Sequence, residues 1–215
     1  PASKPAPEPK PMPLSEADPV LKEDKGGLFL MTVTLRNDLA PDYQPDALFV
    51  RIQKTPPSEQ PRLLRFSVLP ADHFGNGSRK TGKTYFLRFQ IEPGSYRVLG
   101  MNISAGEFPV RGFGFMPIHA DFTVPVGGNF YLGNILGVVR QRHGNEYRIG
   151  PESPQVDQSV TGMSTGTFDV SVQDQYEQDV QLYRSRFPEI KDRKIEKSLL
   201  PPIDRQRAQT YWEEQ

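Results

Sequence analysis

One string in the sequence matches a phosphate-binding motif letter for letter. The residues from Gly77 to Thr84 read Gly-Ser-Arg-Lys-Thr-Gly-Lys-Thr, the pattern of a P-loop. In a nucleotide-binding enzyme Lys83 would reach the phosphates and Thr84 the magnesium, which requires a helix to follow the loop. Here Thr84 instead opens a β-rich run that soon meets Pro93-Gly94. We predict a hairpin loop, and a helix over residues 83–93 would favour the nucleotide-binding alternative.

Other catalytic arrangements are weaker. The three histidines, His73, His119 and His143, lack the short paired spacing of zinc ligands, and cysteine is absent. His119 and Asp121 would share a strand face, and we interpret them as a surface polar pair. The serine in residues 162–166 is not assigned as a hydrolase nucleophile. We therefore predict that the chain is not an enzyme, with no catalytic residue, no metal site and no cofactor.

The composition excludes some classes of partner. Lys+Arg and Asp+Glu number 26 each, so the formal net charge is zero. This argues against a nucleic-acid binder, which must neutralise phosphates, and against a polybasic membrane patch. No apolar run is long enough to span a bilayer. The chain starts at Pro1 without a charged and apolar leader, which we interpret as a mature or trimmed form.

Short β-rich runs dominate the middle of the chain. In one of them Tyr85, Leu87, Phe89 and Ile91 alternate with residues such as Arg88, which would face water. The predicted strands cover residues 27–35, 47–53, 62–69, 84–91, 96–103, 120–124, 129–139, 147–149 and 166–172. Such a series without a long core helix is typical of an antiparallel β-sandwich, and we expect the Ig-like or transthyretin-like type.

Three regions are expected along the chain. Residues 1–24 include seven prolines before residue 20 and predict an extended or disordered tether. Residues 25–173 form the sandwich, with Pro93-Gly94 as a type II turn between two hairpin partners. Residues 174–215 form a helical tail. Its first helix has Asp174 as N-cap and packs on the domain, and a second helix runs from 192 to 200.

Aromatic residues interleaved with glycine mark a candidate contact site. Residues 112–117 read Gly-Phe-Gly-Phe-Met-Pro and predict a loop that exposes apolar surface. Exposed aromatic loops often bind partners, so we name Phe113, Phe115 and Met116 as partner-contact residues; the alternative is a loop tucked under the sandwich edge. A carbohydrate-binding module that uses Trp212 or the exposed aromatics is a further alternative.

The segment from Phe89 to Val98, with its Pro-Gly turn and Tyr96, resembles a recurrent unit of transthyretin-like and carboxypeptidase-regulatory-like sandwiches. Residues 122–133, with Tyr131-Leu132-Gly133, look like the following unit in uncharacterised bacterial lipoproteins. The resemblance covers roughly residues 84–140. It implies a non-catalytic module for protein interaction or envelope structure in the periplasm or outer membrane, reaching the membrane only through an N-terminal lipid anchor.

Overall fold

A computed structural model describes residues 26–55, 63–107, 109–150 and 158–214. The predicted tether lies outside the described residues. None of the helices in the described part is long and apolar enough to cross a membrane.

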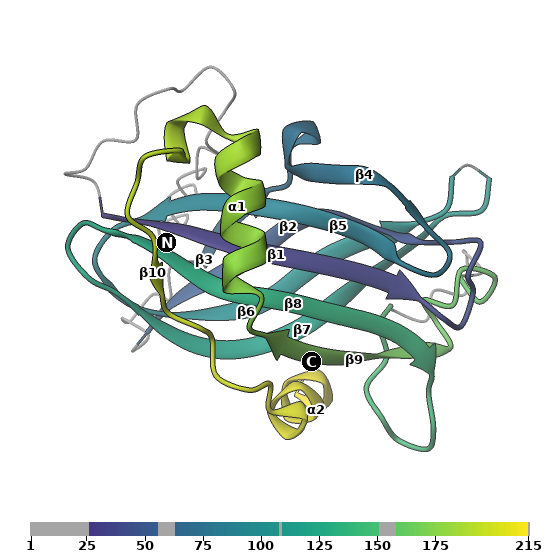
Figure 1. Ribbon diagram of the computed structural model, residues 1–215. Coiled ribbons are helices and arrows are strands. Elements are labelled where there is room, and N and C mark those ends of the chain that lie inside the picture. Colours follow the sequence, from purple (N-terminus) through teal and green to yellow (C-terminus); the bar gives the residue numbers. More distant parts are fainter. Residues whose placement is uncertain (1–25, 56–62, 108, 151–157, 215) are drawn as a thin grey trace, which may run out of the picture.

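The described chain is mainly β and forms two packed sheets, as predicted (Figure 1). The large sheet contains β1 (Gly27–Asn37), β4 (His73–Ser78), β5 (Gly82–Ile91), β8 (Asn129–Gln141), β9 (Gly166–Gln173) and β10 (Glu196–Lys197). The small sheet contains β2 (Pro45–Thr55), β3 (Leu63–Ser67), β6 (Gly94–Ala105) and β7 (Gly112–Val124). The inner faces of both sheets supply one apolar core.

The strand pairing is not wholly antiparallel, which corrects the prediction. The large sheet runs in the order β10-β8-β1-β5-β4, with β9 on the other part of β8. In it β1 and β10 each pair with β8 in parallel. Parallel neighbours need a long crossover, and here most of the domain lies between β1 and β8. Residues 147–149 also form no strand. Ile149 nevertheless accepts a backbone hydrogen bond from the Phe115 N–H and donates one to the Gly166 carbonyl.

The Pro93-Gly94 turn does not join two strands of one hairpin, so that prediction is wrong. It connects β5 in the large sheet to β6 in the small sheet, so the chain crosses between layers there. β5 pairs with β1 and β4, while β6 pairs with β2 and β7. Tyr96 closes this crossing, because its hydroxyl donates to the Glu92 carbonyl at 3.0 Å.

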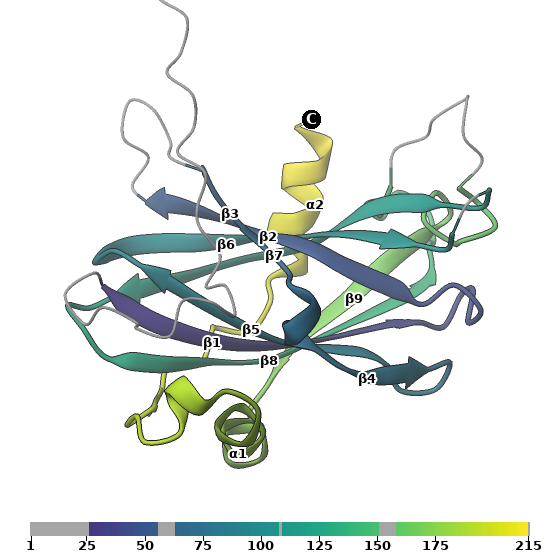
Figure 2. The ribbon, with the colours of Figure 1, turned by 90° about the horizontal axis from the view of Figure 1, so that it is seen from above.

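Helix α1 (Tyr176–Arg186) covers the outer face of the large sheet (Figure 2). Val180 and Tyr183 pack there with Leu30 and Phe86, which confirms the prediction that this helix packs on the parent domain. The N-cap is Gln175 and not Asp174, whose carboxylate accepts the Tyr176 N–H.

The outer face of β5 is also covered, so Arg88 does not face water as predicted. Its side chain is only 5% exposed and pairs with Asp72 and Glu189, beside the short helix η3 (Pro188–Ile190). Its guanidinium lies 3.6 Å from the centre of the Phe187 ring. A buried arginine needs such partners, because an unpaired charge in the interior is costly.

The second tail helix is displaced from its predicted position. Residues 192–200 contain β10, and α2 (Arg205–Glu213) follows it, capped by the Asp204 carboxylate. α2 runs across the edge of the sandwich from β9 to β7 and projects beyond the small sheet (Figure 2). The tail therefore packs on both layers of the domain.

We expect Gly82→Ala to destabilise the fold far more than Gly127→Ala. Both glycines have positive φ, +73° and +69°. A Cβ at Gly82 would lie 2.1 Å from the Leu35 carbonyl oxygen, whereas nothing lies within 4 Å at Gly127. Gly127→Ala should cost about 1 kcal/mol through backbone strain alone, and Gly82→Ala roughly 3 kcal/mol or more. Urea unfolding measures both, and equal losses would contradict the packing of β5 on β1.

Candidate functional site

The P-loop-like string lies in a β-hairpin. It includes the end of β4, a tight turn and the start of β5, and residues 83–91 are strand. Lys83 Nζ lies 2.5 Å from Asp46 Oδ1 in β2, so its ammonium already has a partner. The string lacks the helix N-terminus that a phosphate-binding loop uses.

The other catalytic candidates are not brought together. His73 lies in β4, His119 in β7 and His143 in an exposed loop, and the described residues contain no group of three or more potential metal ligands. Residues 162–166 do match Gly-x-Ser-x-Gly in letters. They form a turn that leads into β9, however, whereas a nucleophile elbow joins a strand to a helix. Ser164 makes no hydrogen bond to a histidine within the described chain.

The glycine–aromatic segment is the first half of β7 and not a loop. Alternate residues of a strand point to opposite faces, so Phe113 and Phe115 lie on the outer side while Met116 points inward. Phe113 is 47% exposed, whereas Met116 is 0% exposed and belongs to the core. Met116 is therefore a core residue in this structure, and the two phenylalanines remain at the surface.

Phe113 and Phe115 line a pocket of about 590 Å³ on the outer side of the small sheet, which we call the aromatic pocket. Its other described walls come from β2, β6, further residues of β7, residues 147–150 and α2. They are Leu48, Phe49, Asn102, Ile103, Gly114, Pro117, Tyr147, Arg148, Ile149, Gly150, Ala208, Tyr211 and Trp212. The volume is typical of a site for a small molecule or an anchoring side chain. Arg148 is the single charged residue among the described lining residues.

Irregular strand pairing shapes this pocket. Phe49, Asn102 and Phe115 are direct neighbours across three strands. Between Ala47 and Phe49 the register of β2 against β6 shifts, so both Leu48 and Phe49 reach the pocket. Bulges re-aim side chains in this way, and sequence periodicity does not reveal them.

Arginines lie against the rings of the pocket. Arg51 lies 5.2 Å from the Phe115 ring centre, and Arg111 lies 5.0 Å from that of Phe113. Arg142 lies 5.6 Å from the Trp212 ring and Arg65 lies 5.7 Å from that of Phe49. Cation–π contacts of this kind hold the guanidinium groups at the rim. Arg142 also donates from Nε to the Glu146 carbonyl, whereas Arg51, Arg65 and Arg111 make no ion pair with a described carboxylate.

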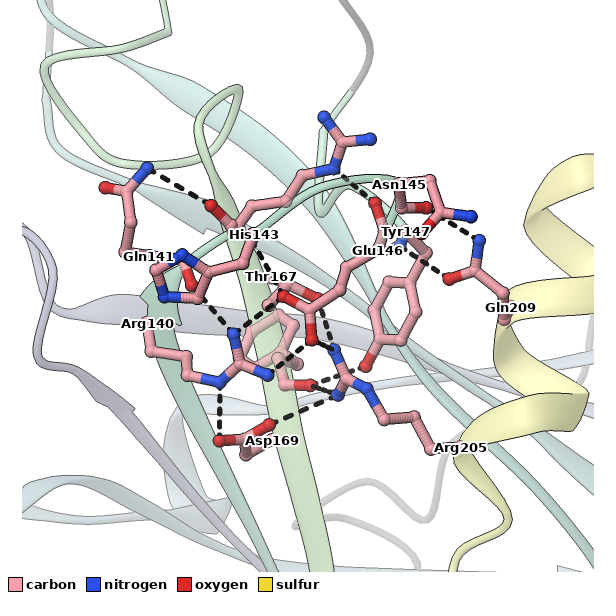
Figure 3. Close-up of polar contacts among 12 residues, drawn as sticks. Arg140, Gln141, His143, Asn145, Glu146, Tyr147, Thr167, Asp169, Arg205 and Gln209 are labelled. Atoms are coloured by element: carbon pink, nitrogen blue, oxygen red, sulfur yellow. Dashed lines mark hydrogen bonds and ion pairs between the residues drawn. The ribbon is translucent and has the colours of Figure 1, made fainter.

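A closed set of ion pairs fixes the α2 wall (Figure 3). Glu146 accepts from Arg140 at 2.6 Å and from Arg205 at 2.9 Å, and Asp169 pairs with the same two arginines at 2.7 and 3.2 Å. Gln209 adds two bonds, accepting from the Tyr147 N–H and donating to the Asn145 carbonyl. The hydrogen bonds from Arg140 hold the pKa of Glu146 down to about 2, so the network stays charged across ordinary pH.

His119 in β7 also packs against α2. It has a positive φ of 49° at a bulge in β7, and its ring centre lies 4.6 Å from that of Tyr211. Burial, followed by the charges of Arg97 and Arg207, lowers the pKa of His119 to about 4, while Asp121 opposes this weakly. His119 is buried, so the predicted surface pair with Asp121 is wrong.

Sequence reasoning named Phe113, Phe115 and Trp212 but missed Phe49 and Asn102. One usable signal was present, because an arginine and a phenylalanine two positions apart share a strand face, as at Phe49-x-Arg51 and Arg111-x-Phe113. No local sequence pattern indicates that α2 packs beside these strands. No family model, no curated protein and no solved structure matches this chain.

We expect Arg205→Gln to loosen α2. The substitution removes the ion pairs to Glu146 and Asp169 and should lower stability by about 1–2 kcal/mol, as for a member of a charge network. Trp212 is the sole tryptophan, so its emission should shift towards that of an exposed indole. Arg79→Gln, at an exposed pair with Asp42, is the matched control. Unchanged emission in Arg205→Gln would show that the network does not hold the helix.

Protonation of His119 should destabilise the protein in mild acid. Because the folded-state pKa is depressed from 6.5 to about 4, the stabilisation is complete above pH 6.5 and is lost as pH falls towards 4. Urea unfolding should show a loss of roughly 2 kcal/mol over this window. His119→Asn, which tolerates positive φ, should flatten the dependence, whereas the exposed His143→Asn should not. Equal slopes in all three proteins would refute the role of His119.

Proposed function

We propose that this chain is a non-catalytic binding module of the cell envelope that contacts a protein partner through the aromatic pocket. The supporting observation is the convergence of Phe113, Phe115 and Trp212 on one hollow of about 590 Å³. Phe113 remains 47% exposed inside it. Large aromatic anchors in such hollows dominate protein–protein binding energy.

The location and fold type rest on the sequence. The proline-rich residues 1–19 and the likeness to envelope lipoproteins support a protein of the periplasm or outer membrane, held by a lipid anchor. An Ig-like or transthyretin-like type of sandwich also stays a proposal, and it supports a binding role.

A carbohydrate-binding module is the second candidate, because Trp212 lies in the same pocket as the exposed phenylalanines. Sugars stack on open aromatic faces. Here Arg142 lies on the Trp212 ring and Arg51 on the Phe115 ring, which leaves less room for stacking. These contacts favour a protein ligand. The nucleotide-binding alternative has no comparable support, because Lys83 is paired with Asp46 in a hairpin.

Photo-crosslinking tests the protein-interaction proposal. Benzoylphenylalanine placed at Phe113 in the full chain, in the cells that produce it, should give one discrete protein adduct. Phe74, 43% exposed on β4, provides the control position. Phe115→Ala should weaken the adduct at Phe113, because it removes a pocket wall. Absence of an adduct at Phe113, or the same adduct at Phe74, would refute the proposal.

A further inference from the structure

We propose that the aromatic pocket recognises an acidic peptide segment, in which an apolar side chain enters the hollow and neighbouring carboxylates meet the rim arginines. This inference rests on the proposed function and specifies its ligand. It starts from the distribution of charge in a chain whose net charge is zero.

Most arginines elsewhere in the described chain are paired with carboxylates, although Arg184 and Arg186 donate to backbone carbonyls instead. Examples of the ion pairs are Arg97 with Asp121 at 2.6 Å and Arg140 with Asp169 at 2.7 Å. Around the pocket the pattern changes. Arg51, Arg65 and Arg111 make cation–π contacts but no ion pair with any described carboxylate.

No described lining residue is acidic, so the pocket has a local excess of positive charge. Glu213, beside Trp212 on α2, does not line the pocket and accepts a hydrogen bond from Gln209. Guanidinium groups held on aromatic rings present planar donors that match a carboxylate. An anionic ligand would therefore meet complementary charge at the rim and apolar surface below it.

The pocket also contains an unused amide. Asn102 lies between Phe49 and Phe115, and its buried Oδ1 has no hydrogen-bond partner among the described residues. A buried polar atom without a partner is unfavourable, so a ligand that hydrogen-bonds this amide would gain affinity. A peptide backbone offers both a donor and an acceptor, which a hydrocarbon ligand lacks.

Charge complementarity selects between occupants. The chain's own residues 1–19 are proline-rich, and aromatic grooves do bind such segments. Their charges are mixed, however, and no acidic cluster stands out: they are Lys4, Glu8, Lys10, Glu16 and Asp18. The rim arginines favour a partner segment in which carboxylates flank an aromatic or aliphatic residue.

Selection from a displayed library of short random peptides tests the inference on the full chain. Peptides are selected on the wild-type protein and counter-selected on Phe113→Asp. This substitution places a negative charge, which would repel an acidic peptide, at an exposed position of the pocket. We expect enrichment of an apolar residue flanked by Asp or Glu. Binding, followed through Trp212 emission, should weaken about tenfold in Arg111→Gln and in Arg51→Gln, as for the loss of one charge-assisted contact.

Lys80→Gln, in the exposed turn before β5, should leave the affinity unchanged. Raising the salt to about 1 M should weaken the wild-type complex and the Lys80→Gln complex alike. Enriched peptides that are neutral, basic or proline-rich would overturn the acidic-ligand inference while leaving the binding function intact. A selection that yields no peptide sensitive to Phe113→Asp would overturn both.

Discussion

The ion pairs among Arg140, Glu146, Asp169 and Arg205 hold the C-terminal helix against the open edge of the sandwich. β8, β9 and the loop after β8 each contribute one member, and α2 contributes the fourth. A single exposed ion pair contributes little, because forming it immobilises two long side chains. In this network each side chain pairs with two partners, so the entropy lost in immobilising it is shared between two ion pairs. With α2 fixed in this way, Tyr211 and Trp212 complete a pocket that the strands alone would leave as an open aromatic surface.

The two outer faces of the sandwich are used differently. On the large sheet the apolar residues Leu28 and Leu30 are covered by α1, which forms a second core beneath it. On the small sheet α2 lies at the edge and covers only part of the outer face (Figure 2), and Phe113 stays about half exposed, at 47%. The same tail thus covers one face and forms a wall of the aromatic pocket beside the other.

The positions of most strands could be predicted from the sequence, whereas the pairing between strands could not. Period-two alternation located β5, because side-chain direction depends on the local backbone alone. The Pro93-Gly94 turn reverses the chain, but turn chemistry does not decide whether the next strand joins the same sheet. The burial of Arg88 likewise depended on Asp72 and Glu189, which only the folded chain brings together.

The candidate site shows the same division between local and long-range information. Phe113 was identifiable from its neighbours. Had residues 112–117 been predicted as a strand, period-two alternation would have predicted that Met116 is buried. Net charge was a poor guide, because equal totals of acidic and basic residues do not imply equal distribution. Most described arginines away from the pocket are neutralised by nearby carboxylates, while Arg51 and Arg111 lie on aromatic rings without one. A neutral chain can therefore carry a cationic binding site, since the local field depends on which charges are paired.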